Sequence, residues 1–522
     1  MTELNPPTRS APQATARTWA GLGVLALPML LLAIDATVLV FALPGIAADL
    51  SPSATEQLWI LDIYSFMLAG LLVTMGALGD RIGRKKLLLV GAVLFTAASV
   101  AGAFSTSPTQ LIAARAALGL AGATIMPSTL SMVRAMFADR AQRRLAIAVW
   151  ATMGSLGAAA GPVVGGWLLE HFWWGSAFLI NIPVMVLLLV LGPVLLTESR
   201  HPNPGPLDLP SAGLSLVAML STVYGLKTLA AGHGTIATAL AAVALGLGVG
   251  VLFVRRQLIL PDPLLDVRLF RVRAFRGAVV ADLLSVFALV GSMFALAQYL
   301  QLVAGLSPMR AGLWLLPAMA FSAAAGFIAA ALVKRINAAV LVSAGLVLAA
   351  AGFSVLFTLT PTSGPVPVAV ALSSISLGAG IGMTLTNDVI MSSVAPERAG
   401  GAAAISETAY ELGTALGTAV LGSVLAVTYR THLLADPIAA VAVAPGPLER
   451  ASATIAEAFT VAAEHSNAAG QALITAARTA FTDGLVITSI CGAAIMLVAA
   501  SWAAVTLRGT SATADLTHHS DH

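Results

Sequence analysis

The sequence predicts an all-α polytopic membrane protein with fourteen transmembrane helices. Of its 522 residues, 58% are hydrophobic and only 10% are charged, whereas soluble domains carry about a quarter charged residues. About fourteen apolar stretches are long enough to cross a bilayer. Basic residues also gather in alternate connections between these stretches, which is the pattern that orients membrane helices. The chain is therefore expected to cross the membrane many times.

The first apolar stretch, from about Trp19 to Phe41, is too long for the core of a cleaved signal peptide and lacks a small-residue cleavage site. We expect it to remain as the first membrane helix. The others follow it at short intervals along the chain. The predicted spans are residues 19–42, 57–78, 87–105, 110–132, 145–169, 176–196, 210–230, 235–254, 278–303, 310–332, 338–360, 366–392, 401–427 and 484–506.

The basic residues predict the orientation of these spans. With the N-terminus placed inside, 21 of the 27 Lys and Arg residues fall in inner loops and tails, whereas Lys227 and four arginines fall outside. The positive-inside rule then places both termini in the cytoplasm and the protein in the cytoplasmic (inner) membrane. The long segment 428–483 is expected outside, where its Ala-rich part fits either an amphipathic helical hairpin or a flexible loop.

The predicted spans contain a small set of acidic residues. Four of them are candidate site residues, namely Asp35, Asp62, Glu407 and Glu411, whereas Asp282 and Asp388 lie nearer the inner helix ends and Glu170 lies at an outer end. A charge near the middle of a bilayer costs about 3 kcal/mol on insertion scales, so such residues usually have a function. A carboxylate removed from water has a raised pKa and can exchange a proton near neutral pH, and in its charged form it attracts a cation. Glu407 and Glu411 share one helix face and could bind one cation together. We expect Gly413 and Gly417 to leave room beside that face, and Tyr410 and Trp59 to offer aromatic surface of the kind that lipophilic cations prefer. We expect these four acids to serve proton coupling and substrate binding, with Asp62 nearer the outer surface, where water could reach it.

Arg115 lies in the fourth predicted span, within ARAALGLAGA. An intramembrane arginine indicates a functional site by default, and a purely structural ion pair is the alternative. Because Arg115 is close in the predicted helix bundle to the acids of the first half, we add it to the proton-coupling and substrate-binding set.

Two glycine patterns stand out. The turn GALGDRIGRKK (76–86) contains more than a basic anchor, because its glycines and its aspartate are regularly spaced, and we interpret it as a cytoplasmic gating loop formed by Gly76, Gly79, Asp80, Arg81, Gly83 and Arg84. In the fifth span, glycines recur on one helix face, which allows another helix to approach closely. This packing motif consists of Gly154, Gly157, Gly161, Pro162, Gly165 and Gly166.

Together these segments resemble the signature motifs of the major facilitator superfamily. These segments are AIDATVLVFALP, GALGDRIGRKK, RAALGLAGA and GSLGAAAGPVVGG. A further similarity, to the fourteen-helix drug:proton antiporters of the QacA and LfrA type, rests on the number of spans and on LWILDIYSFMLAG and SETAYELGTALG. The resemblance implies a major facilitator fold of 6 + 2 inserted + 6 helices. The implied division is an N-terminal tail (1–18), a six-helix half (19–200), two inserted helices (201–256), a second half (257–506, including 428–483) and a C-terminal tail (507–522).

The same resemblance implies a proton-coupled antiporter that exports lipophilic, mainly cationic drugs from the cytoplasm or inner leaflet, such as quaternary ammonium compounds, dyes and fluoroquinolones. A dedicated exporter of one self-made antibiotic or metabolite remains the alternative, and a proton-coupled importer is a further one. The implied partners are protons, lipophilic cationic small molecules and the lipid bilayer. We expect no nucleic acid and no obligate protein partner.

Other classes of membrane protein find little support in the residues. The four lysines never follow a glycine, so an ATP-binding GxxxxGK[ST] loop is missing. The eight histidines fall in loops, helix ends or tails, and THHSDH (517–522) is interpreted as a solvated tail and not as a metal site. The single cysteine, Cys491, excludes an internal disulfide. We therefore expect a transporter, with no catalytic residues, metal or cofactor.

Overall fold

The computed structural model of the protein describes residues 13–200, 208–231, 236–261, 263–394, 399–465 and 467–508. Within these ranges, 13 helices are long and apolar enough to cross a membrane, and the bent helix α5 makes fourteen. This confirms the predicted fold class. The spans are α1 (Ala16–Leu50), α2 (Ala54–Ile82), α3 (Arg84–Ala103), α4 (Pro108–Met136), α5 (Arg140–His171), α6 with α7 (Ser176–Leu179 and Asn181–Leu195), α8 (Leu209–Ala231), α9 (Ile236–Ile259), α10 (Arg273–Gln298), α11 (Pro308–Leu332), α12 (Ala338–Val355), α13 (Val366–Ser392), α14 (Ala399–Ala435) and α18 (Asn467–Thr506).

Local sequence explains several helix boundaries. At the start of α2, Ser53 and Glu56 form a capping box: the Ser53 N–H donates to Glu56 Oε2 (2.9 Å), and the Glu56 N–H donates to Ser53 Oγ (3.3 Å). In α5, the parts Leu145–Ala158 and Ala160–His171 meet at 43°. Pro162 explains this bend, because it has no N–H to donate to the carbonyl of Ala158 one turn earlier.

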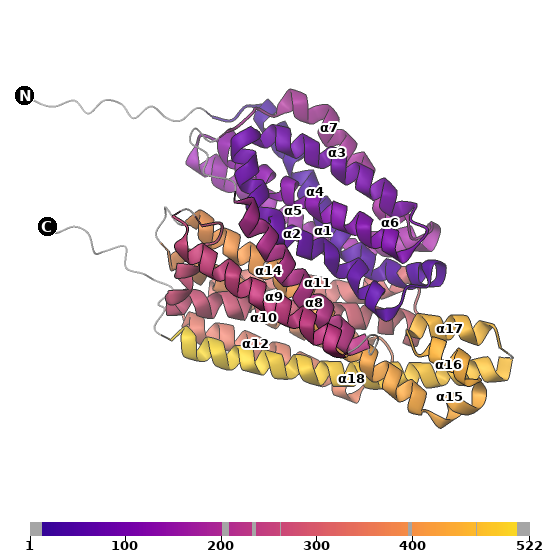
Figure 1. Ribbon diagram of the computed structural model, residues 1–522. Helices are drawn as coiled ribbons and strands as arrows, with labels where there is room; N and C mark the ends of the chain where they lie inside the picture. Colours follow the sequence, from indigo (N-terminus) through magenta and orange to yellow (C-terminus); the bar gives the residue numbers. More distant parts are fainter. Residues whose placement is uncertain are drawn as a thin grey trace, which may run out of the picture.

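Two large buried cores run through the bundle. One joins the helices α1–α7, and the other is built mainly from α10–α18 and reaches Phe41 and Leu58 of the first helices. In Figure 1 the two helix groups lie one above the other, with α1–α7 on the upper side. This arrangement agrees with two six-helix halves, while the exact residue boundaries between the parts remain a prediction.

The inserted helices α8 and α9 form a tight hairpin. A Cβ on Gly246 of α9 would lie 2.2 Å from Thr222 Oγ1 of α8, so the two backbones approach as closely as a glycine permits. Only α8 enters the bundle, where it packs against both α2 and α14. A small core of Phe66, Val223, Ala415 and Ala419 therefore joins the first half, the hairpin and the second half.

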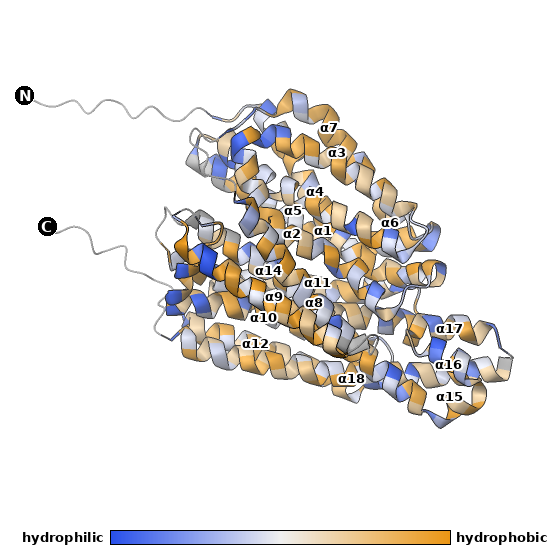
Figure 2. Ribbon diagram, viewed as in Figure 1, coloured by the Kyte–Doolittle hydropathy of each residue, from blue (hydrophilic) through white to orange (hydrophobic). Residues whose placement is uncertain are grey.

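The start of α1 and the end of α18 lie at the same end of the bundle, which we call the terminal end, and the short helices α15 (Pro437–Ala442), α16 (Pro445–Ala451) and α17 (Ile455–Ala463) cap the opposite, distal end (Figure 1). Hydrophilic residues concentrate near the two ends, and hydrophobic residues dominate between them (Figure 2). The protein is thus a multi-pass membrane protein.

The long segment 428–483 is helical. The α14 helix extends to Ala435, α18 begins at Asn467, and α15–α17 lie between them. The α17 helix buries Ile455, Ala458 and Val461 on one side, as expected for the amphipathic hairpin and not for a flexible loop. The terminal sequence THHSDH lies outside the described residues.

Candidate functional site

The first buried acid, Asp35 of α1, is held by two other helices. Arg115 Nη1 of α4 lies 2.7 Å from Asp35 Oδ2, and Asn181 Nδ2 of α7 donates to Asp35 Oδ1 (3.0 Å). Both side chains of the ion pair are only 2% exposed. Arg115 also donates from Nε to the Ile60 carbonyl of α2 (3.2 Å), and its guanidinium lies 4.5 Å from the centre of the Tyr64 ring. A charged pair can persist in such a position because each charge has a partner and further hydrogen bonds.

The second buried acid, Asp62 of α2, lies where three parts of the protein meet. Lys227 Nζ of the inserted helix α8 lies 2.7 Å from Asp62 Oδ2, and both side chains are only 1% exposed. The ammonium group also lies 4.2 Å from the centre of the Trp59 ring. Thr418 of α14 hydrogen-bonds to the same carboxylate. One side chain of the first half therefore contacts both the inserted hairpin and the second half.

This arrangement corrects two expectations. The sequence interpretation placed Lys227 outside the membrane and Asp62 near a surface where water could reach it, but the structure buries both. A prediction from hydropathy and basic-residue counts assigns a lysine near the end of an apolar stretch to solvent. Such a prediction contains no information about a partner on a distant helix. The only available signal was the position of Lys227 inside a predicted span, in a chain that also has acids without an evident partner in other spans.

The membrane-span acids Glu407, Glu411 and Asp282 of the second half form no ion pair with a described Lys or Arg. Glu407 and Glu411 lie one turn apart on α14, and Ser65 of α2 hydrogen-bonds to Glu411. Asp282 of α10 is 4% exposed and accepts a hydrogen bond from Thr386 of α13 (3.2 Å), and it is close enough to Glu407 for the two carboxylates to interact electrostatically. The sequence interpretation put Asp282 near the helix end and left it out of the candidate site, whereas its burial and proximity place it beside Glu407.

The surroundings of these glutamates differ from expectation. Gly413 and Gly417 were expected to leave space for a ligand, but they pack against α10: a Cβ on Gly413 would lie 2.7 Å from the Leu283 carbonyl oxygen, and one on Gly417 would lie 2.2 Å from that of Phe287. Of the two aromatic residues expected near the site, Trp59 already contacts the Lys227 ammonium group with the face of its ring, whereas Tyr410 is 39% exposed. Space for a ligand must therefore come from other residues or from helix movement.

The turn between α2 and α3 is fixed by its glycine and by an acid distant in sequence. Gly83 has a φ of 108°, which other residues rarely adopt. Asp80 and Arg84 form an ion pair (2.7 Å) on adjoining helix ends. Glu198, after α7, accepts the Lys85 N–H with Oε1 (3.0 Å), so its negative charge lies at the start of α3, where helix dipoles favour it. Sequence reasoning missed Glu198, because its partner lies more than 100 residues away.

Two further glycines of this loop are also packed against other residues. A Cβ on Gly79 would lie 3.2 Å from Leu87, and one on Gly76 would lie 3.7 Å from Pro127 of α4. Arg81 lies in the last turn of α2.

The glycines of α5 contact two different helices. A Cβ on Gly157 would lie 2.2 Å from the Leu30 carbonyl oxygen of α1, and Gly161 and Gly165 continue this contact toward Thr37 and Val38, whereas Gly154 is less crowded. Gly166 instead faces Met309 of α11, and a Cβ on Gly312 of α11 would lie 2.3 Å from the Pro162 carbonyl oxygen. The motif thus packs α5 against its own half on one side and against the second half on the other.

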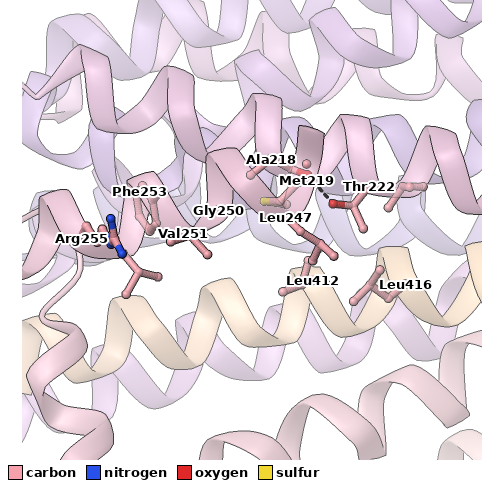
Figure 3. A pocket seen from close by; sticks show the side chains of 13 residues that line it. Ala218, Met219, Thr222, Leu247, Gly250, Val251, Phe253, Arg255, Leu412 and Leu416 are labelled. Atoms are coloured by element: carbon pink, nitrogen blue, oxygen red, sulfur yellow. Dashed lines mark hydrogen bonds between the residues drawn. The ribbon is translucent and has the colours of Figure 1, made fainter. Parts of the chain in front are cut away.

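An apolar groove of about 560 Å³ runs between the inserted hairpin and α14 (Figure 3). Met219 and Thr222 of α8, Leu247 and Val251 of α9, and Leu412 of α14 line it, and Arg255 lies at one end. Leu412 follows Glu411 directly in α14. The groove therefore runs beside the helix that carries the acidic pair.

Comparisons with known proteins agree on the kind of protein. The sequence profile of the Major Facilitator Superfamily matches residues 25–418. The chain is similar to the multidrug efflux pump LfrA of Mycolicibacterium smegmatis, with 45% identity over 96% of this chain and 98% of that protein. It is 39% identical to the methyl viologen resistance protein SmvA of Salmonella typhimurium, over 89% of this chain and 93% of that one.

A solved structure has the same overall fold. The crystal structure of a bacterial homolog of the human lysosomal transporter Spinster, inward-facing and occupied, superimposes with a TM-score of 0.65 over 94% of this chain and 97% of that one, at 17% identity.

Proposed function

We propose that this chain, which belongs to the major facilitator superfamily, exports lipophilic, mainly cationic drugs in exchange for protons. It is a transporter and not an enzyme, and its relatives are multidrug and antibiotic efflux proteins. The observation that carries the proposal is the set of carboxylates in the spans, namely Asp35, Asp62, Glu407 and Glu411, with Asp282 beside them.

A carboxylate in such a place can hold either a proton or an organic cation, and this competition is the simplest exchange mechanism. Asp35 and Asp62 are neutralised by Arg115 and Lys227. Glu407 and Glu411 form no ion pair with a described Lys or Arg, so they are the members of the set most open to a proton or an external cation.

More than one titrating acid is useful for energetic reasons. Exchange of one proton for one monovalent cation moves no net charge, so one pH unit supplies only about 1.4 kcal/mol. With two protons, one pH unit and 100 mV together supply about 5 kcal/mol.

We also propose how the protein lies in the cytoplasmic membrane. The terminal end carries the basic turns at residues 81–86 and 268–276, so the positive-inside rule favours a cytoplasmic terminal end and an external distal end with α15–α17. In this orientation, the gating loop at Gly83 would control cytoplasmic access, and the α5 contacts with α1 and α11 would provide a surface on which the halves move.

An export assay tests the function. Inside-out vesicles containing the protein should take up ethidium and a quaternary ammonium compound when a proton gradient is imposed, and a protonophore should abolish the uptake. Uptake that persists after the gradient collapses would contradict proton coupling.

A dedicated exporter remains a second candidate, because one relative is the tetracenomycin C resistance and export protein of Streptomyces glaucescens, 33% identical over 78% of this chain. Transport of chemically unrelated cations in the same vesicles would favour the multidrug function. Transport of one compound class alone would favour the dedicated one.

A further inference from the structure

Lys227 occupies a site that has the chemistry of an organic-cation site. Its ammonium group lies between a carboxylate, Asp62 (2.7 Å), and the face of an indole ring, Trp59 (4.2 Å). A carboxylate combined with an aromatic face is the arrangement that recognises ammonium ligands, and the attraction grows when water is excluded. Both charged side chains are 1% exposed, so water is excluded here.

The cation comes from outside the two six-helix halves. Lys227 belongs to α8 of the inserted hairpin, whereas Asp62 and Trp59 belong to α2, and Thr418 of α14 contacts Asp62 from the second half. Lys227 Nζ has no hydrogen-bond partner among the described residues, so only the ion pair with Asp62 and the contact with the Trp59 ring hold it in place. A lysine ammonium is a compact charge on a flexible stem of four carbons, so it can leave this position without unfolding α8.

The neighbouring pair is built differently. Arg115 is fixed by Asp35, by the Ile60 carbonyl and by the Tyr64 ring. Asp35 is fixed in turn by Asn181. Arg115 is therefore held by several groups at once, whereas Lys227 is held by far fewer and has the features of a replaceable occupant.

We propose that Lys227 is a built-in competitor for cationic substrates: its ammonium group fills the Asp62–Trp59 site, an organic cation binds there by displacing it, and its return helps to expel the substrate. This inference rests on the proposed export of cations and assigns the inserted hairpin a direct part in substrate binding. The apolar groove along α8 approaches the same region, since Thr222 and Val223 line it one turn before Lys227.

Binding to the purified protein in nanodiscs tests the proposal. Lys227→Met keeps the length of the side chain and removes the charge. If Lys227 fills the site about nine-tenths of the time, its removal should tighten binding of tetraphenylphosphonium about tenfold. Lys227→Arg should bind like the wild type, and binding of a neutral lipophilic dye should be the same in all variants.

A second variant tests whether Asp62 is the group for which Lys227 and the substrate compete. The double variant Asp62→Asn/Lys227→Met leaves no unpaired charge, so it should fold, and it should lose the gain in affinity because the carboxylate is gone. In vesicles, Lys227→Met should lower both KM and kcat for the cation, since the substrate enters more easily and leaves more slowly.

Two outcomes would overturn the inference. Unchanged or weaker tetraphenylphosphonium binding by folded Lys227→Met would show that the pair only attaches the hairpin to the bundle. A gain that persists in the double variant would show that Asp62 is not the contested group. Failure of the proposed function is distinguishable, because wild-type vesicles would then show no proton-driven uptake of the cation at all.

Discussion

Arg115 and Asp35 join α4 to α1 through a 2.7 Å ion pair inside the first half, and Asn181 of α7 completes the coordination of the carboxylate. A purely structural pair and a proton-coupling pair would share this geometry. They differ in their response to substitution, because proton coupling requires a group that changes charge, whereas a structural link requires only matched partners.

We expect Asp35→Asn to insert into the membrane but to lose proton-driven export, and to be less stable than the wild type because the buried Arg115 loses its charged partner. An amide can still accept a hydrogen bond from Arg115, yet it never binds or releases a proton. Asp388→Asn is the matched control, because Asp388 is an exposed carboxylate on α13. Vesicle uptake of ethidium measures the effect. Full activity of Asp35→Asn toward every substrate would reduce Asp35 to a structural role.

Arg115→Lys should also export poorly. The ammonium group keeps the charge but loses the planar group that contacts Asp35, Ile60 and the Tyr64 ring together. Arg115→Ala should destabilise the protein by about 3–5 kcal/mol, because it leaves Asp35 buried without its charged partner.

The double variant Asp35→Asn/Arg115→Ala should recover much of this stability, and Arg310→Lys, at an exposed position, serves as the control. Thermal unfolding and vesicle uptake provide the two measurements. Normal export by Arg115→Ala would show that the residue is a dispensable anchor.

The sequence predicted the fold more completely than it predicted the candidate site. Apolar length was sufficient to predict the spans, because each span is a local property of about twenty residues. The site depends on contacts between helices distant in the chain. Asp35 and Arg115 were identified as unusual residues, but Lys227, Asn181 and Glu198 were missed, since nothing near them in sequence shows which helix they face. For the same reason, Gly413 and Gly417 were interpreted as open space, although they pack against α10.

Gly83→Ala should disturb the turn between α2 and α3. A φ of 108° is strained for alanine, at about 1–3 kcal/mol, and the new Cβ would lie 2.6 Å from the Glu198 carboxylate. We expect a lower unfolding temperature together with slower export. Gly248→Ala on α9 is the control, because no other atom lies within 4 Å of its Cβ position. Equal behaviour of the two variants would contradict a special role for the turn.

The distal helices should loosen in acid. Hydrogen bonds from Arg450 to Glu464 (3.0 Å) hold the pKa of Glu464 below its usual value. A carboxyl group with a depressed pKa in the folded state stabilises that state above its unfolded pKa, and this contribution is lost as the pH falls through the folded pKa. Amide hydrogen exchange of α16 and α17 should therefore be faster in Glu464→Gln than in the wild type at neutral pH. The difference between the two proteins should vanish below the pH range in which carboxyl groups titrate, and it should shrink in high salt. A difference independent of pH would exclude this origin.

Glu407 and Glu411 should determine selectivity for cations. They lie one turn apart on α14, and no described Lys or Arg neutralises them, so an organic cation gains more from them than a zwitterion, whose binding depends more on apolar contact. Glu407→Gln and Glu411→Gln should each reduce export of a quaternary ammonium compound several times more than export of a zwitterionic drug. Glu170→Gln, at the exposed end of α5, should change neither. Parallel uptake assays of the two substrates test this prediction. Equal losses for both would assign Glu407 and Glu411 to proton coupling or folding, because export of either substrate depends on coupling and on folding. Unchanged transport would leave the two glutamates without a role in export.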